Sequence, residues 1–424
     1  MNKKVLLIAH HFYPSNASGA HRPAKLAKYL PHFGWTPVVL CAEWTPENSG
    51  NMYDPLLTAQ PDVCRTVRVP YPAKPSSKVG RAIYWTSPVL FPYRAPFGFT
   101  RRMLAAAEDL VRQEHFDVIW STYMPGLTHY VASRIARRYG IPWVADFRDI
   151  PDQDFGPWRL RHTVRQEVRA CRWASALTAT TTRQTERLAS RYDKPAYAVF
   201  NGFDPDDFPP GRKVDPDKFT IRYFGGLSEH RNPRPLFLAL DRLAEVGEVD
   251  LNEVRVEFYG ASPGVVSASA TGCRCCTSLV CHGRIAHAEV IELQQRSAGL
   301  LLLKLPEAGE SIPAKVFEYM GSARPILNVP GDGDIVDALL HETGAGISAE
   351  SPKEIAKALR RWYEEWKATG TVVYRGIPEK IARYTRREQA GQLARIFDSM
   401  TPGRSGGGMG SHSRGRKEAA SNAG

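Results

Sequence analysis

Residues 310–325 read ESIPAKVFEYMGSARP, and they follow an apolar run, Ala298–Leu303, that has the length and composition of a buried strand. Pro313 marks the start of a helix, because proline is favoured at the first helical position, where no N–H partner is needed. The free backbone N–H groups of such a helix start form a site for an anionic group such as a diphosphate. Lys315 adds a positive charge beside that site, and the Glu318 carboxylate can accept paired hydrogen bonds from neighbouring hydroxyls. An amphipathic helix with solvated glutamates would have the same composition, so both interpretations stay open on these residues alone.

Strand and helix signals alternate on both sides of this stretch, which predicts parallel sheets covered by helices. The strands expected in the N-terminal half are Val5–Ala9, Val38–Cys41, Val118–Ser121, Trp143–Asp146, Ala176–Thr180 and Ala196–Phe200. Those expected in the C-terminal half are Phe219–Phe224, Val254–Phe258, Val280–His282, Ala298–Leu303 and Pro325–Leu327. We therefore expect an α/β protein with two Rossmann-like domains, residues 1–205 and 214–385, followed by a helix over 386–400 and a disordered basic tail over 401–424.

Composition narrows the classes of protein. A chain of 424 residues is too long for one ordinary core, and its net charge of +12 favours an anionic partner, whether nucleotide phosphate, membrane surface or nucleic acid. Seven scattered cysteines argue against a disulfide framework and for a cytoplasmic location. The apolar run Val5–Ala9 is too short for a signal peptide, and no run approaches the roughly 18 apolar residues of a spanning helix.

Residues 310–325 resemble the Glu-x7-Glu motif of retaining glycosyltransferases of family 4, which have the GT-B architecture of two facing Rossmann-like domains. Pro313, Lys315, Tyr319 and Pro325 make the resemblance specific. It implies transfer of a sugar from a nucleoside-diphosphate sugar to a hydroxyl, with retention of configuration. Glu310 would bind the hydroxyls of the donor sugar and Glu318 the ribose. We expect the donor diphosphate to lie against the remaining motif residues, Ser311, Ile312, Pro313 and Lys315.

A second segment, YFGGLSEHRN at 223–232, places a Gly-Gly turn directly after a strand, where a ligand can approach the backbone closely. It resembles a family segment that has a basic residue at the position of Gly226. Gly225 and Gly226 are therefore expected at the donor, while Arg231 and Lys315 share the departing diphosphate; with Glu310 they are the expected catalytic residues. A surface helix cap is the alternative for Arg231. Gly283 resembles the family's turn beside the nucleotide base.

Two N-terminal segments are expected to face the cleft. Residues 10–22 resemble the family's loop between the first strand and the first helix, so Gly19, His21 and Arg22 would reach the acceptor or the diphosphate. Residues 143–149, WVADFRD, end a strand, and ligands gather at the carboxyl ends of strands in open α/β sheets. That position makes Asp146, Arg148 and Asp149 cleft candidates; the alternative is an Asp–Arg pair that braces the junction of strand and loop. The segment that begins at Tyr384 is similar to the GT-B terminal helix that crosses back onto the N-terminal domain.

Two other features imitate metal sites. Asp332-Gly-Asp334 precedes a predicted helix and is better explained as a loop ending in a helix N-cap. Cys273, Cys275, Cys276, Cys281 and His282 have a spacing that matches no standard zinc finger. We expect no metal and no other cofactor, since the nucleotide sugar is a substrate.

Residues 63–107 contain eight basic, seven aromatic and no acidic side chains. This composition is typical of a membrane-interface surface, and also of a surface that stacks nucleobases or of a solvated loop. Because glycosyl acceptors are often lipid-linked, we expect docking on an anionic membrane, at the inner face of the plasma membrane, and no specific nucleic-acid binding. The expected acceptor is lipid-linked or a polysaccharide precursor.

Two other functions stay open on the sequence. A GT-B sugar-nucleotide epimerase would convert the donor without an acceptor, although the Glu-x7-Glu context argues against it. A non-catalytic protein that binds nucleotides or nucleic acid would use the basic tail and residues 63–107.

Overall fold

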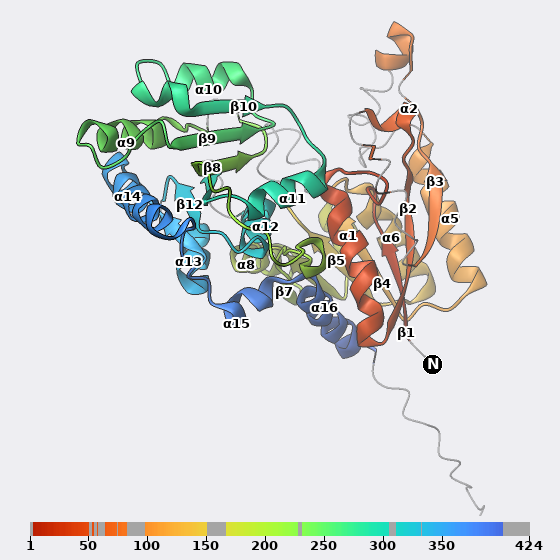
Figure 1. Ribbon diagram of the computed structural model, residues 1–424. Coiled ribbons are helices and arrows are strands. Elements are labelled where there is room, and N and C mark those ends of the chain that lie inside the picture. The colour runs from red at the N-terminus through yellow and green to blue at the C-terminus, as the bar shows by residue number, and fades with distance from the viewer. Residues whose placement is uncertain are drawn as a thin grey trace, which may run out of the picture.

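Two parallel sheets form the framework of the molecule, one in each of two domains that lie side by side (Figure 1). The computed structural model describes residues 3–50, 53–54, 57, 64–73, 75–82, 98–150, 167–227, 231–304, 311–331 and 333–401. The N-terminal sheet has the order β3 (Arg65–Pro70), β2 (Trp35–Glu43), β1 (Lys3–Ile8), β4 (Val118–Tyr123), β5 (Trp143–Phe147), β6 (Ala176–Ala179), β7 (Ala196–Ala198). The C-terminal sheet has the order β10 (Leu279–His282), β9 (Val254–Tyr259), β8 (Phe219–Phe224), β11 (Gly299–Leu303), β12 (Ile326–Val329), β13 (Gly346–Ser348). The predicted pair of Rossmann-like domains is confirmed.

Helices cover these sheets. The N-terminal domain has α1 (Ser18–Tyr29), η1 (Leu30–Phe33), α2 (Pro46–Ser49), α5 (Phe99–Gln113), α6 (Leu127–Tyr139) and α8 (Thr182–Tyr192), and η4 (Pro205–Asp207) follows in the hinge. The C-terminal domain has α9 (Arg234–Glu245), α10 (Pro263–Ser269), η5 (Arg274–Ser278), α11 (His287–Gln295), α12 (Ala314–Gly321), α13 (Ile335–Thr343) and α14 (Pro352–Thr369). The chain then runs through α15 (Pro378–Ile381) and η6 (Ala382–Tyr384) into α16 (Arg386–Met400). Among the described residues, no helix has the length and apolar character needed to cross a bilayer.

The central strands are buried on both faces, and β1 and β11 contain unbroken apolar runs. In β1, Val5 and Leu7 belong to one core cluster, while Leu6 and Ile8 belong to the cluster on the opposite face. In a strand, successive side chains point to opposite faces, so an unbroken apolar run is what a sheet covered on both sides requires.

Each sheet has a switch point where the strand order reverses. β1 lies between β2 and β4, and β8 lies between β9 and β11. The loops that leave neighbouring strands at such a point run in opposite directions and open a crevice at the carboxyl ends of the strands. In the C-terminal domain the turn after β8 lies beside the start of α12, where Lys315 Nζ donates to Phe224 O at 2.8 Å.

The hinge between the domains is fixed to the start of α16. The Phe203 backbone N–H donates to Tyr384 O at 3.1 Å, and the Arg386 backbone N–H donates to Phe203 O at 2.8 Å, as in a pair of strands. A Cβ on Gly202 would lie 2.1 Å from Gln389 Nε2, so the close approach requires glycine. α16 itself packs on the N-terminal domain, where the rings of Trp35 and Phe397 lie 5.1 Å apart.

Asp204 makes the hinge an ionic junction as well. Its fully buried carboxylate accepts hydrogen bonds from Lys25 at 2.7 Å, from Lys28 at 2.8 Å and from the Tyr29 hydroxyl. Burial opposes ionisation, but these three donors outweigh it and hold the pKa of Asp204 at about 2. The hinge is therefore bound to α1 by a charge that persists at every ordinary pH.

Two parts of the N-terminal domain differ from the sequence-based prediction. The helix α1 begins at Ser18 and contains Pro23, so the prediction that residues 10–22 form a loop was wrong for residues 18–22. β3 and α5 fall within residues 63–107, and Phe99 and Met103 are fully buried. Part of the segment predicted to be a membrane surface is therefore core.

Candidate functional site

The turn after β8 holds a lysine against its backbone. Lys315 Nζ donates to Phe224 O at 2.8 Å, lies 3.3 Å from the Tyr223 hydroxyl and sits 4.3 Å from the centroid of that ring. A Cβ on Gly225 would lie 2.9 Å from Lys315 Nζ, and Gly225 has a φ of +126°, which other residues rarely adopt. A Cβ on Gly226 would meet nothing within 4 Å, so this turn opens onto free space. The structure thus joins two segments that the sequence had predicted to share one ligand.

Arg231 contributes a second cation to this turn. Its Nη1 donates to Gly226 O at 3.2 Å, and its Nε is buried with no partner among the described residues. Burial, together with the nearby charge of Arg231, lowers the pKa of Lys315 to about 7. Two cations that face one turn, without a carboxylate between them in the described part of the chain, form a site for a dianion such as a diphosphate.

The start of α12 lies beside this pair. Pro313 is its N-cap residue, Ile312 is buried and Ser311 is partly exposed. The helix begins at Ala314, one position after the predicted start, so its free N–H groups remain available to an anion. Glu310, the predicted sugar-binding and catalytic carboxylate, lies outside the described residues.

Glu318 faces the other domain from the middle of α12. Its Oε1 lies 3.5 Å from His287 Nε2, at the start of α11, and its side chain is 34% exposed. Burial opposes ionisation of Glu318, but the contact with His287 and the positive charge of Arg386 outweigh it and lower its pKa. A partly exposed, ionised carboxylate can accept hydrogen bonds from the two hydroxyls of a diol.

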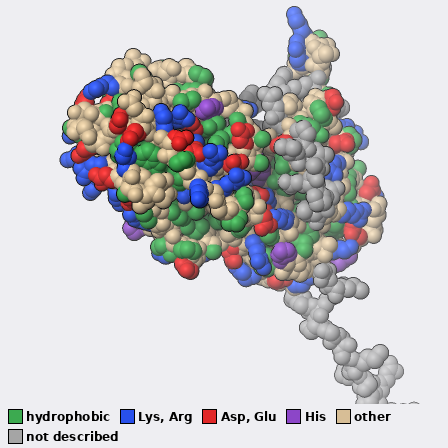
Figure 2. All heavy atoms as spheres, viewed as in Figure 1, with side chains coloured by type: hydrophobic (Ala, Val, Ile, Leu, Met, Phe, Trp, Pro, Cys, Tyr) green, Lys and Arg blue, Asp and Glu red, His purple; other side chains and the backbone are tan. Residues whose placement is uncertain are grey.

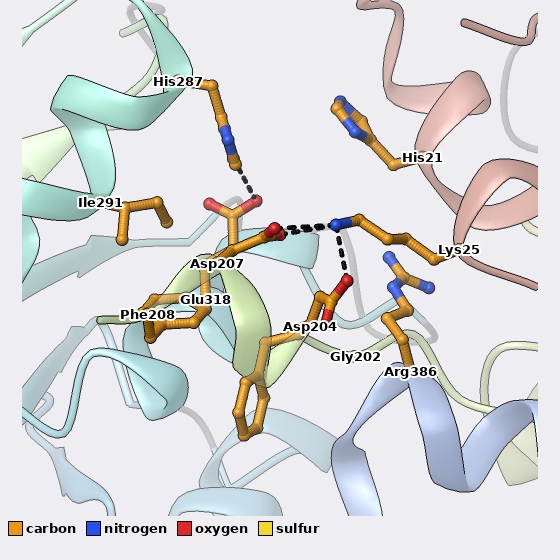
Figure 3. A pocket seen from close by; sticks show the side chains of 11 residues that line it. His21, Lys25, Gly202, Asp204, Asp207, Phe208, His287, Ile291, Glu318 and Arg386 are labelled. Atoms are coloured by element: carbon orange, nitrogen blue, oxygen red, sulfur yellow. Dashed lines mark hydrogen bonds and ion pairs between the residues drawn. The ribbon is translucent and has the colours of Figure 1, made fainter. Parts of the chain in front are cut away.

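A small cavity of about 30 Å³ lies where the two domains and the hinge meet (Figure 3). α1 contributes His21 and Lys25, the hinge contributes Asp204 and Asp207, and the C-terminal domain contributes His287 and Glu318. Lys25 points toward the two hinge carboxylates, with Nζ at 2.8 Å from Asp207 Oδ1. Because both domains line this cavity, a change in their relative position changes its shape.

Three stacked rings follow the carboxyl ends of β8, β9 and β10. The Tyr259 ring lies between the rings of Phe224 and His282. Its centroid is 5.0 Å from that of Phe224, with an angle of 13° between the planes, and 4.4 Å from that of His282, with an angle of 11°. Its hydroxyl donates to Glu257 Oε2 at 2.9 Å, and Glu257 also accepts from Arg222 at 2.6 Å. The turn at Gly283 follows this stack, and a Cβ there would meet nothing within 4 Å.

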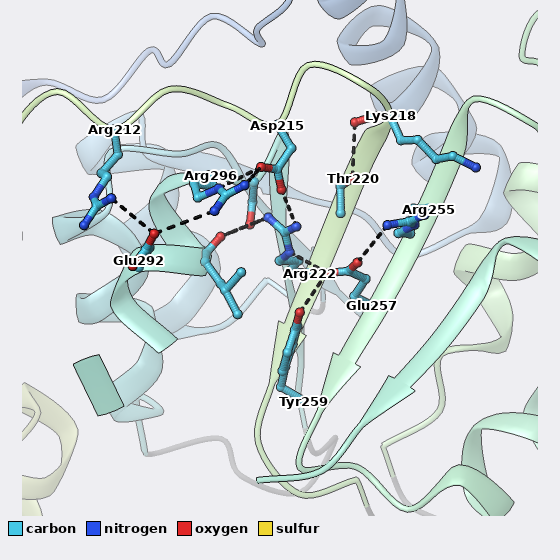
Figure 4. Close-up of polar contacts among 12 residues, drawn as sticks. Arg212, Asp215, Lys218, Thr220, Arg222, Arg255, Glu257, Tyr259, Glu292 and Arg296 are labelled. Atoms are coloured by element: carbon cyan, nitrogen blue, oxygen red, sulfur yellow. Dashed lines mark hydrogen bonds and ion pairs between the residues drawn. The ribbon is translucent and has the colours of Figure 1, made fainter. Parts of the chain in front are cut away.

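A network of ion pairs supports the stack from within the domain (Figure 4). Arg222 is 4% exposed and joins Glu257 to Asp215, which Arg296 also contacts at 2.6 Å. Because Glu257 holds the Tyr259 hydroxyl, these pairs fix the ring at the edge of the sheet. We interpret the network as structural support for the turns after β8 and β10.

Arg22 and Asp146 were predicted to face the cleft, and the structure places them beneath it. Their side chains are 2% and 0% exposed, and Arg22 Nη2 donates to Asp146 Oδ1 at 2.7 Å. Arg22 also donates to Val199 O and Phe200 O, both at 2.9 Å. Asp146 further accepts from the hydroxyls of Thr122 at 2.9 Å and Thr178 at 2.7 Å. These contacts support the bracing alternative, with Arg22 rather than Arg148 as the partner of Asp146.

The other N-terminal candidates surround the carboxyl end of β5. Arg148 Nε donates to Tyr123 O at 2.8 Å, and a Cβ on Gly19 would lie 3.0 Å from its guanidinium. Burial lowers the pKa of Arg148, while neighbouring Asp149, which is exposed, opposes that shift. His21 lines the cavity, and its ring stacks on His287 at 5.8 Å. Gly19 therefore leaves room for Arg148, and His21 is the candidate that reaches the opposite domain.

The two features that imitate metal sites have structural roles where they are described. Asp334 is the N-cap of α13, where Oδ1 accepts from Val336 N–H at 2.8 Å, as predicted, and Oδ2 pairs with Lys304; Asp332 lies outside the described residues. Cys275 is fully buried, and its thiol contacts Phe237 O at 3.6 Å. Among the described residues, no three His, Cys, Asp or Glu side chains are grouped so as to hold a metal ion.

Sequence reasoning did not identify His287, Lys25 or Arg386 as residues of this site. Lys25 follows His21 by one helical turn, so both lie on one face of α1. His287 ends the segment that was compared with the family's turn, and Arg386 follows Tyr384 in the segment that predicted the terminal helix. The spacing of His21 and Lys25 on α1 is the one signal in the sequence that could have identified any of the three. His287 and Arg386 are far from the other site residues in sequence and come close to them only in the folded chain.

Comparison with known proteins gives a family match and a set of similar folds. Residues 19–200 match the family model of a glycosyl transferase 4-like domain. No curated protein sequence gives a significant match. Among solved structures, HepE of Anabaena in complex with UDP and glucose is similar, with a TM-score of 0.61, 15% identity and coverage of 94% of this chain and 100% of that chain. Sucrose-phosphate synthase of Thermosynechococcus elongatus has a TM-score of 0.63, 14% identity and coverage of 94% and 99%. A glycosyltransferase of Rickettsia africae has a TM-score of 0.62, 12% identity and coverage of 94% and 98%.

If Arg22 and Asp146 brace the domain, their removal should cost stability. We expect Arg22→Met to lower the free energy of unfolding by about 3–5 kcal/mol, because it leaves a buried carboxylate without its cation. The double variant Arg22→Met/Asp146→Leu should recover part of that loss. Urea unfolding measures the free energy of unfolding of both variants. The control is Arg360→Met, because Arg360 pairs with Glu248 at 3.0 Å on the surface, where an ion pair contributes about 0–1 kcal/mol. Equal losses for Arg22→Met and Arg360→Met would contradict the bracing role.

Proposed function

We propose that the protein transfers a sugar from a nucleoside-diphosphate sugar to a hydroxyl acceptor, with retention of configuration. Residues 19–200 belong to the glycosyl transferase 4-like family, and the whole chain has the GT-B fold. The resemblance to family 4 glycosyltransferases predicted from the sequence is thereby confirmed. The observation that carries the proposal is the pair of cations, Lys315 and Arg231, at the open Gly225–Gly226 turn.

The arrangement supports a donor bound along the C-terminal sheet. A diphosphate at the turn would neutralise both cations and accept from the N–H groups at the start of α12. The ribose would then lie toward Glu318, and the base toward Gly283 and the stacked rings. HepE, which shares the fold, is seen in complex with UDP-glucose, and a nucleotide sugar of this class has the charge that the site requires.

In the proposed reaction the bond between the anomeric carbon and the diphosphate oxygen breaks, and a bond between the anomeric carbon and the acceptor oxygen forms. The acceptor proton leaves on the diphosphate, so no protein base is required. Negative charge develops on the leaving group, and Lys315 and Arg231 lie where they can stabilise it. Glu310 would hold the sugar. We propose that this chemistry requires no metal ion and no further cofactor.

For the acceptor we propose a lipid-linked or polysaccharide-precursor hydroxyl at the cytoplasmic face of the membrane. Residues 78–82 form a short helix that projects from the N-terminal domain, shown in light orange in Figure 1. Val79 is 72% exposed there between the exposed side chains of Lys78 and Arg81, and Figure 2 shows basic side chains at this tip. An apolar side chain flanked by cations suits an anionic membrane surface. Tyr71 and Phe99 pack against each other at 4.8 Å and do not contribute to that surface.

The two donor-site side chains should be dispensable for folding and essential for transfer. We expect Lys315→Ala and Glu318→Ala to unfold at nearly the wild-type temperature and to lower turnover by about 10²–10³-fold at saturating donor. Circular dichroism and release of nucleoside diphosphate measure the two properties. Lys357→Ala, at an exposed position on α14, is the control and should retain full activity. Near-normal turnover of either donor-site variant would contradict the assignment.

The lowered pKa of Lys315 predicts a pH dependence of donor affinity. A lysine whose pKa is about 7 carries its charge below that pH and loses it above. Because binding requires the ammonium form, we expect affinity for a nucleoside diphosphate to fall by up to about ten-fold per pH unit as the pH rises above the pKa. Titration calorimetry checks this slope, which Lys315→Met should abolish; an unchanged slope in that variant would assign the titration to another group.

The projecting helix predicts salt-sensitive membrane binding. A chain ending at Met400, which lacks the basic tail, should sediment with anionic vesicles of phosphatidylserine and phosphatidylcholine, because each cation near such a surface contributes about 1 kcal/mol before screening. Binding should weaken with salt, with Trp85→Ala and with Lys78→Ala/Arg81→Ala. Lys353→Ala/Lys357→Ala, on the C-terminal domain, is the matched control. If the truncated chain stays in the supernatant at low salt, a soluble acceptor replaces the lipid-linked one.

A further inference from the structure

His287 is in contact with a carboxylate of its own domain and with a ring of the other domain. Its Nε2 lies 3.5 Å from Glu318 Oε1, and its ring stacks on His21 with centroids 5.8 Å apart and planes at 28°. His21 is in turn held by Tyr13, whose hydroxyl lies 3.3 Å from His21 Nδ1. Figure 1 shows α1 and α11 facing each other where the domains meet, and Figure 3 shows His287 pointing toward Glu318 with His21 opposite. His21, His287 and Glu318 therefore form a chain of contacts from α1 to α12.

The charges around this chain of contacts leave His287 as the direct partner of Glu318. Lys25 is engaged by Asp204 at 2.7 Å and by Asp207 at 2.8 Å. Arg386 donates to Gln389 Oε1 at 3.2 Å, and it influences Glu318 only through its charge. Within the described residues, the ion pair of Glu318 is the one with His287.

The surroundings of the two imidazoles favour the charged form of His287 and the neutral form of His21. The Glu318 carboxylate holds the pKa of His287 above its ordinary value against the opposing effect of burial. Burial, and next the charge of His287, lower the pKa of His21 to about 4. A charged His287 therefore stacks on a neutral His21, which removes the repulsion between the rings and leaves the ion pair with Glu318 intact.

We propose that His287 is a positioning residue: it orients the Glu318 carboxylate toward the ribose hydroxyls of the nucleotide and, through its stack on His21, links that orientation to the position of the N-terminal domain. This inference rests on the proposed function and adds a residue to its donor site. A carboxylate that binds a diol must hold one rotamer, and ordering it before the ligand arrives lowers the entropic cost of binding. With Oε1 beside His287, Oε2 and the free lone pairs of Oε1 remain for the two hydroxyls.

Ribose recognition gives a test that separates positioning from a general effect on folding. The probes are UDP, ADP and GDP, each compared with its 2′,3′-dideoxy analogue by titration calorimetry at about pH 6, where an imidazole with a raised pKa is protonated. We expect His287→Ala to weaken the ribonucleotide by roughly ten-fold, as for a lost contact to a charged group, and to leave the dideoxy analogue unchanged. His287→Gln, which can still donate to Glu318, should recover part of the loss. His341→Ala, at an exposed position on α13, is the control and should behave as wild type.

Glu318 and His21 complete the test. His287→Ala added to Glu318→Ala should cause no further loss, because His287 acts through that carboxylate. His21→Ala should weaken the ribonucleotide by a smaller factor, and His21→Phe, which keeps an aromatic stack, should restore it. Equal weakening of the ribonucleotide and the dideoxy analogue in His287→Ala would overturn the positioning role while the proposed function stood. Failure of the wild-type chain to bind any of the three diphosphates would overturn the proposed function itself.

Discussion

The junction at Asp204 binds the hinge between the two domains to α1, and the cavity lined by both domains lies beside it. The carboxylate is fully buried and is bound by Lys25, Lys28 and Tyr29 of α1, while the neighbouring Phe203 backbone pairs with the start of α16. A buried carboxylate without these donors would be strongly disfavoured, so the hinge and α1 are held together as one unit. His21 lies on the same helix as Lys25, and its ring is 5.8 Å from that of His287 in the C-terminal domain.

The proposed donor site has the opposite character, since within the described part of the chain Lys315 and Arg231 form no ion pair with a carboxylate. Lys315 and Arg231 face the same turn, and burial together with the nearby charge of Arg231 lowers the pKa of Lys315 to about 7. Such an arrangement is unfavourable until an anion arrives, which is common at functional sites. The contrast between a neutralised hinge and an unneutralised turn marks the place where the ligand is needed.

The sequence predicted the elements that are buried on both faces and the motifs that lie within one segment. β1 and β11 contain unbroken apolar runs because helices cover both sides of the sheets, and the Glu-x7-Glu stretch could be recognised because its residues follow one another within one short segment of the sequence. β3 was missed because Arg65 and Arg68 alternate with apolar residues on an edge strand, and the start of α1 was misplaced because Pro23 lies inside that helix. The pairs Arg22–Asp146 and His287–Glu318 could not be predicted, because their members meet only after the chain has folded.

We propose that the cleft binds a nucleoside-diphosphate sugar without a metal ion. Titration calorimetry of the full chain with UDP-, ADP- and GDP-glucose in the presence of EDTA tests it most directly. We expect saturable binding of at least one of these donors with one site per chain, driven by contacts to a dianionic diphosphate. Absence of binding for all of them under these conditions, or binding that appears only when Mg²⁺ or Mn²⁺ is restored, would contradict it.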